Sequence, residues 1–306
     1  MKKVFFSILL VLVYFTIQAQ DSLIIKSPTA QLFTRVYSPE HTETVFLLHG
    51  GPGVPDDLLP VVDLLKANYR VIVFDQRGSL RSPCEPNRFR MEDYIADIHA
   101  IATYFQLESF HLFGHSWGGL YAQIYAQAHP EKISSLFLCS PGSGTGKVWR
   151  QTEKEVLRYN KRVSSGKEWA YLGWQSLLSL FGNDRAAQRS FHQVVLNYQK
   201  GFATFEIDTA ALQRIRAKSI SKTRKQIKKY PILQAVPNAK YPIRITYGTG
   251  DIYEESKQDV YRRYPSASFA EIEKSGHFPW AQNPEAFRKI IQDFYLGKKQ
   301  DTPAVR

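Results

Sequence analysis

Short apolar runs alternate along much of the chain with segments in which apolar residues recur every three or four positions. The runs predict buried strands over Thr44–Leu48, Tyr69–Phe74, Phe110–Phe113 and Ile133–Cys139. The recurring pattern predicts helices over Tyr94–Phe105 and Leu120–Ala128. Strands that alternate with helices favour a mostly parallel sheet covered by helices, so the expected fold class is α/β.

The alternation stops near residue 141 and resumes near residue 241. Between these points the chain is basic and helical in pattern, without a convincing strand. Strands are predicted again over Ile243–Tyr247 and Ser268–Ile272, followed by a closing helix over Pro284–Leu296. We therefore expect a core built from residues 20–140 and 241–306, with a helical cap of residues 141–240 inserted before the last strands.

The first residues have the pattern of a secretory signal peptide. Two lysines follow Met1, and an uncharged stretch then runs from Val4 to Ile17 before Gln18-Ala19-Gln20. This stretch of 14 residues is shorter than the ~20 that span a bilayer, although an uncleaved anchor stays an alternative. We expect a signal peptide over residues 1–19, an exported protein that is periplasmic or secreted, and no membrane span after cleavage.

The composition is that of a globular protein, with 43% hydrophobic and 22% charged residues among 306. It excludes disordered, collagen-like and coiled-coil proteins. The two cysteines form no CxxC motif, so neither a structural zinc site nor a thioredoxin-like dithiol is expected. Export would permit a Cys84–Cys139 disulfide, but the apolar run around Cys139 favours a packed thiol.

The formal net charge of +12 is concentrated in one window. Residues 147–229 carry 18 Lys or Arg against six acids, and the rest of the chain is near neutral. Such a surface attracts nucleic acid, anionic lipid or an acidic substrate, and it is also typical of a solvated helical face. Export and the lack of a recognisable nucleic-acid motif argue against a nucleic-acid partner.

The candidate nucleophile lies where a predicted strand meets a predicted helix. Gly114-His115-Ser116-Trp117-Gly118 matches the GxSxG pattern and follows the strand Phe110–Phe113. Small residues on both sides let the backbone turn sharply, which presents the Ser116 hydroxyl at the start of the helix. Ser116 is therefore the predicted catalytic nucleophile.

A serine nucleophile needs an imidazole to take its proton and a carboxylate to orient that imidazole. Among eight histidines, His277 is the candidate base because it follows the strand Ser268–Ile272 at the same sheet edge. Asp251 ends the strand before it and is the candidate carboxylate, with Glu255 and Asp259 as alternatives. The chain order Ser, Asp, His is the one expected on an α/β-hydrolase sheet.

Two backbone N–H groups are predicted to stabilise an oxyanion. One belongs to Trp117, directly after the nucleophile, and the other to Gly51 in the loop His49-Gly50-Gly51-Pro52-Gly53. The stretch Pro141–Lys147 only partly matches a phosphate-binding loop, since its first position is proline and Val148 ends it. No nucleotide, other cofactor or metal site is expected.

These motifs together resemble the α/β-hydrolase superfamily, and specifically the proline iminopeptidase-like branch of serine peptidases. The matching segments are HGGPG at 49–53, DQRGS at 75–79, GHSWGG at 114–119, GTGD at 248–251 and SGHFPW at 275–280. The resemblance implies a helical lid over the site and hydrolysis of short substrates, often the removal of an N-terminal residue from a small peptide. It also departs from the branch: Leu80 replaces a glycine, and no lid carboxylate aligns with those that hold the substrate's α-amino group.

The sequence therefore predicts an exported serine hydrolase that forms an acyl-enzyme on small peptide, amide or ester substrates. The alternatives are a carboxylic ester hydrolase or acyltransferase, and a non-catalytic ligand-binding protein on the same scaffold. The expected partner is a small-molecule or short-peptide substrate. Because the cap is basic, we expect anionic or neutral acyl substrates to be preferred over those with a free α-amine.

Overall fold

The computed structural model describes residues 21–56 and 58–297, and these contain an eight-stranded sheet in the order β1-β2-β4-β3-β5-β6-β7-β8. The strands are β1 (Asp21–Ser27), β2 (Ala30–Tyr37), β3 (Thr44–Leu48), β4 (Arg70–Phe74), β5 (Phe110–His115), β6 (Ile133–Cys139), β7 (Ile243–Gly248) and β8 (Ser268–Ile272). From β4 to β8 all neighbours pair in parallel. The predicted α/β class with a mostly parallel sheet is confirmed.

Two strands at the N-terminal edge of the sheet were not predicted. β1 and β2 form an antiparallel hairpin, and β2 pairs antiparallel with β4. In β2 the inward residues alternate with more exposed ones, since Ala30 and Leu32 are buried on either side of Gln31. An alternation this short is a weak signal, because the pattern gives way to continuous burial over Thr34–Val36.

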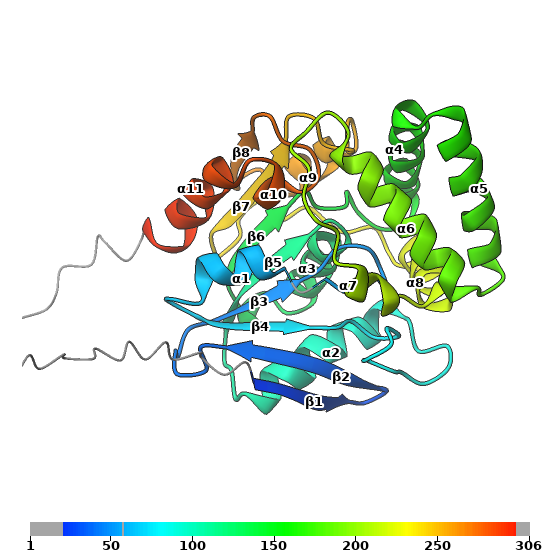
Figure 1. Cartoon of the computed structure of the whole chain (residues 1–306). Coiled ribbons are helices and arrows are strands. Elements are labelled where there is room, and N and C mark those ends of the chain that lie inside the picture. Colours follow the sequence, from blue (N-terminus) through cyan, green and yellow to red (C-terminus); the bar gives the residue numbers. More distant parts are fainter. Residues whose placement is uncertain (1–20, 57, 298–306) are drawn as a thin grey trace, which may run out of the picture.

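Helices cover both faces of the sheet (Figure 1). On one face, α2 (Met91–Tyr104) and α3 (Trp117–Ala128) bury residues such as Ile98 and Leu120 in the larger apolar cluster. On the other, α1 (Leu59–Leu65) and α11 (Pro284–Tyr295) bury Val61 and Phe287 in a second cluster. Successive residues of β3 point alternately into the two clusters, as the two-residue period of a strand requires. The sheet is therefore buried on both sides.

Five helices lie between β6 and β7, beyond the carboxyl ends of the strands (Figure 1). They are α4 (Lys147–Val163), α5 (Gly166–Leu180), α6 (Asp184–Gln199), α7 (Thr209–Gln213) and α8 (Ala217–Lys229). The short 3-10 helix η1 (Pro130–Lys132) and helices α9 (Lys257–Arg263) and α10 (Pro279–Gln282) complete the described elements. None of the helices in the described ranges is both long and apolar enough to cross a membrane. The predicted signal peptide over residues 1–19 lies outside the described residues.

A buried ion pair fixes α2 to the segment after β4. The Arg77 guanidinium donates to both carboxylate oxygens of Asp97, at 2.7 and 2.6 Å, and both side chains are fully buried. Arg77 also donates to the Thr29 hydroxyl and to the backbone carbonyls of Arg88 and Asp93. Burial raises the pKa of Asp97 to about 6, although the Arg77 charge acts in the opposite direction.

Replacement of Asp97 by Asn should destabilise the protein strongly, because it leaves the Arg77 charge buried without its counter-ion. We expect a loss of about 3–5 kcal/mol in the free energy of unfolding, measured by urea denaturation at neutral pH. Asp63→Asn is the matched control, since Asp63 is 63% exposed and pairs with Lys66 on the surface. Equal losses in the two variants would contradict the role assigned to the buried pair.

Candidate active site

Ser116 occupies a strained turn between β5 and α3. Its φ of 56° and ψ of −118° lie in a region that residues with a side chain rarely adopt. The turn is tight because two glycines remove side chains from it. A Cβ on Gly114 would overlap the Gly118 carbonyl, and one on Gly118 would overlap the carbonyl oxygen of Leu48. The sharp turn that the GxSxG pattern predicts is therefore present, with Ser116 at its apex.

The structure brings together the three side chains predicted to form the triad. His277 Nε2 lies 2.9 Å from Ser116 Oγ, and His277 Nδ1 lies 3.1 Å from Asp251 Oδ1. His277 and Asp251 are buried, whereas Ser116 is partly exposed. The alternatives to Asp251 lie elsewhere: Asp259 pairs with Arg262 on the surface, and no ion pair joins Glu255 to His277 among the described residues.

Hydrogen bonds hold the carboxylate of Asp251 in its ionised form. Burial opposes ionisation, but His277, the Ser140 hydroxyl and the Tyr253 backbone N–H outweigh it and hold the pKa of Asp251 below its usual range. Ser140 Oγ donates to Asp251 Oδ2 at 2.5 Å, and Tyr253 N donates to Oδ1 at 3.2 Å. Ser140 follows β6, so adjacent strand ends supply the carboxylate and a donor that supports it.

The glycine-rich loop after β3 approaches the nucleophile closely. A Cβ added to Gly50 would lie 3.0 Å from the Cβ of Ser116, and Gly51 adopts a positive φ of 57° that suits glycine. Gln76 connects this loop to α3, since its side chain donates to the His49 carbonyl and accepts a hydrogen bond from the Trp117 indole. Trp117 is the first residue of α3, a position whose backbone N–H has no partner within the helix.

Aromatic side chains surround His277. The rings of Tyr253 and Tyr198 each lie 5.3 Å from the imidazole in an edge-on arrangement, and the Tyr253 hydroxyl lies 3.4 Å from Ser116 Oγ. His115 Nε2 lies 2.8 Å from the His277 carbonyl oxygen. Burial, with the neighbouring His277, holds the pKa of His115 well below its usual range, so His115 is neutral at physiological pH. A neutral imidazole with Nε2–H then donates to that carbonyl.

Cap residues reach the predicted site directly. Tyr198 of α6 packs on His277, and Phe205 lies 5.3 Å from Phe278. Phe202 is so close to Gly250 and Gly276 that a Cβ on either would contact its ring. The nearest walls contributed by the cap are therefore aromatic.

Two buried carboxylates tie the cap to the core. The Glu155 carboxylate of α4 accepts hydrogen bonds from the backbone N–H groups of Glu254, Glu255 and Ser256, at 3.0–3.1 Å. Arg214, after α7, lies 3.4 Å from Asp75 at the end of β4. Sequence reasoning assigned no role to Glu155, because its partners lie about a hundred residues further along the chain.

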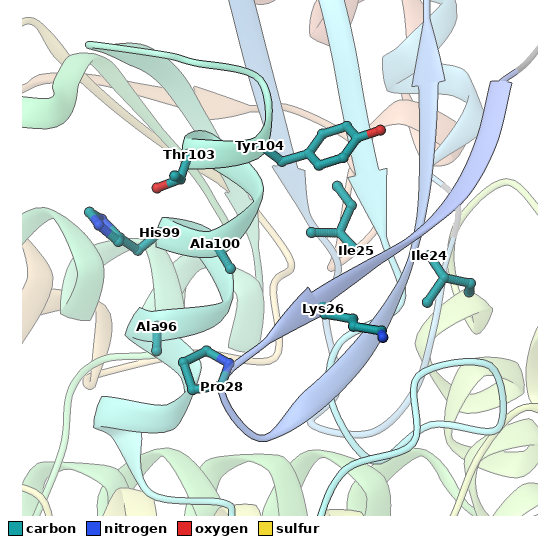
Figure 2. A pocket seen from close by; sticks show the side chains of 9 residues that line it. All are labelled: Ile24, Ile25, Lys26, Pro28, Ala96, His99, Ala100, Thr103 and Tyr104. Carbon is teal, nitrogen blue, oxygen red and sulfur yellow. The ribbon is translucent and has the colours of Figure 1, made fainter.

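Other candidate features lie apart from this site. An apolar hollow lies between β1 and α2, with Ile25, Ala100 and Tyr104 among the residues that line it (Figure 2). Cys84 and Cys139 are free, and the buried Cys139 has the packed thiol favoured from its apolar run. No group of three or more His, Cys, Asp or Glu side chains within the described ranges has a geometry that could hold a metal ion.

Comparisons with known proteins identify the family and the fold. The family described as alpha/beta hydrolase fold matches residues 43–284. A proline iminopeptidase of Clostridioides difficile is 22% identical over 273 residues, which cover 83% of this chain and 90% of that protein. The structure of an epoxide hydrolase from Bacillus megaterium matches with a TM-score of 0.69 at 16% identity. The match covers 89% of this chain and 99% of the epoxide hydrolase. The structure of carboxylesterase CesB from Bacillus subtilis matches with a TM-score of 0.62 at 15% identity. The match covers 91% of this chain and 92% of the esterase. These two structures share the fold.

Gly118→Ala should abolish the turn around Ser116, since the new methyl group would overlap backbone atoms of β3 that cannot move aside. We expect a loss of several kcal/mol in the free energy of unfolding or failure to fold, measured by thermal and urea denaturation. Gly173→Ala is the matched control, because a Cβ there meets nothing within 4 Å and Gly173 lies inside α5. That variant should gain roughly 0.5–1 kcal/mol. A stable, fully active Gly118→Ala variant would contradict the steric assignment.

Proposed function

The chain belongs to the α/β-hydrolase fold family and is a hydrolase similar to proline iminopeptidases, and we propose that it is a serine hydrolase that forms an acyl-enzyme. Its substrates in this proposal are small peptides, amides or esters. The observation that carries the proposal is the pair of contacts made by His277, at 2.9 Å to Ser116 Oγ and 3.1 Å to Asp251. Those contacts match the nucleophile, base and orienting carboxylate of acyl transfer.

In this proposal the proton of Ser116 passes to Nε2 of His277 as Oγ attacks the substrate carbonyl. Asp251 accepts from Nδ1–H, which fixes the tautomer that leaves Nε2 free to take the proton. The resulting imidazolium then protonates the leaving amine or alcohol. Water activated by His277 cleaves the acyl-enzyme and regenerates the serine. The hydrogen bond from Ser140 to Asp251 supports the ionised carboxylate throughout the cycle.

The negative charge on the tetrahedral intermediate requires preorganised donors. We assign this role to the backbone N–H groups of Gly51 and Trp117. The close approach of the glycine loop to Ser116 supports the assignment, as does the position of Trp117 at the start of α3. The Gln76 side chain bonds to the His49 carbonyl and to the Trp117 indole, so it contacts both segments that carry the two donors.

The surroundings of the site favour substrates without a free α-amine. The cap residues nearest His277 and Phe278 are aromatic, and five of the six cap acids are already engaged. Glu155 and Asp208 accept backbone hydrogen bonds, while Glu153, Glu168 and Asp184 pair with basic side chains. The sixth, Glu206, is exposed and follows Phe205, which packs against Phe278 next to His277. With one cap acid left to meet an ammonium group, and with a basic cap around it, a carboxylic ester hydrolase, or an amidase for N-blocked substrates, is the second candidate.

We also propose that the protein is exported. Support comes from residues 1–19, where two lysines precede an uncharged stretch that ends before Gln18 and Ala19. Both cysteines are free in the described chain, so the fold requires no disulfide in the compartment that receives it. Detection of the mature chain beginning near Gln20 in the periplasm or medium, by N-terminal sequencing, would test the proposal.

Ser116→Ala should lose nearly all turnover, because the other two members of the triad cannot act without the nucleophile. We expect a decrease in kcat of at least about 10⁴-fold on the best substrate, with an unchanged unfolding midpoint. A fluorophosphonate probe should label the wild-type protein and Ser134→Ala, a surface serine variant, but not Ser116→Ala. Wild-type kcat in Ser116→Ala would exclude the mechanism, and absence of turnover in the wild type would favour the ligand-binding alternative.

Succinylation of a prolyl arylamide should increase kcat/KM relative to the free-amine substrate, because the basic cap attracts the added carboxylate. The advantage should shrink as salt rises to about 0.15 M, where the Debye length shortens to roughly 8 Å. Steady-state kinetics at low and physiological salt measure both effects. Faster, salt-insensitive turnover of the free-amine substrate would instead support an iminopeptidase.

A further inference from the structure

Helix α5 exposes an unusual number of large apolar side chains. Trp174 is 58% exposed and Leu177 47%, and the exposed fraction rises to 72% at Leu180 and 82% at Phe181 just after the helix. Tyr171 is 42% exposed one turn before Trp174. The spacing of three or four residues between Tyr171, Trp174, Leu177 and Phe181 places them along one side of the helix. We call these four residues, together with the neighbouring Leu180, the α5 face.

The α5 face is free of charge over its whole length. No Asp, Glu, Lys or Arg occurs between residues 169 and 183, whereas the cap around it is the most highly charged part of the chain. The opposite side of α5 buries Leu172 and Gln175, and the helix packs on α6. Exposure of a contiguous apolar face on a monomer marks a surface that binds something.

Basic side chains flank this face. Lys167 lies at the beginning of α5, Arg185 follows its end, and the side chain of Lys218 lies 3.3 Å from a Cβ built at Gly182. All three are exposed or extend into solvent, and none forms an ion pair within the part of the chain that the structure describes. The nearest acids are neutralised: Glu168 pairs with Lys200 and Asp184 with Arg216. The flanks of the face therefore carry uncompensated positive charge.

We propose that the α5 face docks on an anionic lipid surface. Trp and Tyr favour the boundary between headgroups and acyl chains, while Leu and Phe enter the apolar layer below it. The flanking lysines and arginine then meet lipid phosphates, with each basic residue near the surface contributing to the attraction. The combination of an apolar ridge and a basic border is complementary to a bilayer that contains acidic lipids.

The charge of the cap argues against other occupants. A second copy of the chain would bring two strongly basic caps together, since residues 147–229 carry 18 basic residues against six acids. A nucleic acid would satisfy the positive charge but leave Leu177, Leu180 and Phe181 in water. An anionic lipid surface offers both negative charge and an apolar interior, so it covers both kinds of side chain.

The docking surface is separate from the candidate active site. Helix α6, which contacts His277 through Tyr198, lies between α5 and the core (Figure 1). None of the residues of the α5 face contacts the proposed triad or its supporting side chains in the hydrogen bonds and ring contacts of the described residues. Lipid binding and hydrolysis of a short substrate can therefore be measured independently.

Cosedimentation of the full chain with vesicles tests the proposal. Vesicles of phosphatidylcholine mixed with phosphatidylglycerol should bind the wild type, and Trp174→Ser/Phe181→Ser should bind at least about tenfold more weakly. Replacement of Lys167, Arg185 and Lys218 by Gln should weaken binding about fivefold per residue. The control for the apolar variant is Ile24→Ser/Phe269→Ser, at exposed positions of the edge strands β1 and β8. The control for the basic variant is Arg288→Gln/Lys289→Gln on α11, and both controls should bind like the wild type.

Quenching of Trp174 fluorescence distinguishes docking by α5 from any vesicle binding by residues 1–19. Vesicles with brominated acyl chains should quench tryptophan fluorescence in the wild type, and Trp174→Phe should remove most of the quenching while it keeps the affinity. Unchanged quenching in Trp174→Phe, equal loss in the control variants, or equal binding to pure phosphatidylcholine would overturn the proposal. The proposal would also be overturned if the wild type did not bind vesicles and light scattering detected a dimer that only Trp174→Ser/Phe181→Ser dissociates. Hydrolysis of a short substrate at the wild-type rate verifies that each variant is folded.

Discussion

The position of α3 against the end of β3 depends on the absence of a side chain at residue 118. A Cβ there would overlap the Leu48 carbonyl, so only glycine lets the helix begin so close to the neighbouring strand. This approach places the loop that follows Leu48 beside Ser116, and it directs the start of α3 toward the same point. The turn at Ser116 and the glycine loop are thus two results of one packing constraint between a helix and a strand.

Three consecutive side chains after β4 contact three different parts of the molecule. Asp75 meets Arg81 and the cap residue Arg214, Gln76 joins His49 to Trp117, and Arg77 binds Asp97 of α2. All three are buried polar groups, which are costly unless their hydrogen bonds are satisfied. These contacts explain why so polar a tripeptide lies in the interior. Each residue fixes the position of one neighbouring segment through directional hydrogen bonds, which apolar packing alone does not provide.

Much of the core could be predicted from the sequence, because long apolar runs and helical periodicity are local signals. The predicted core strands and helices agree with the structure within three residues, from β3 through α11. The hairpin β1–β2 was missed because its alternation is short. The candidates Ser116, Asp251 and His277 could be selected because each follows a strand. Ser140, Gln76 and Glu155 could not, since their importance depends on partners far away in sequence.

The buried carboxylate of Glu155 has a consequence for how this fold can diversify. It accepts hydrogen bonds from the backbone N–H groups of residues 254–256, which follow Asp251 closely in sequence. A cap exchanged as a block with that of a relative without this carboxylate would leave three amide groups near Asp251 without their acceptor, and that of Ser256 is buried. The cap is therefore not an interchangeable module: residue 155 and the loop at 254–256 must change together, so that recombination between distant relatives succeeds only when both segments come from the same parent.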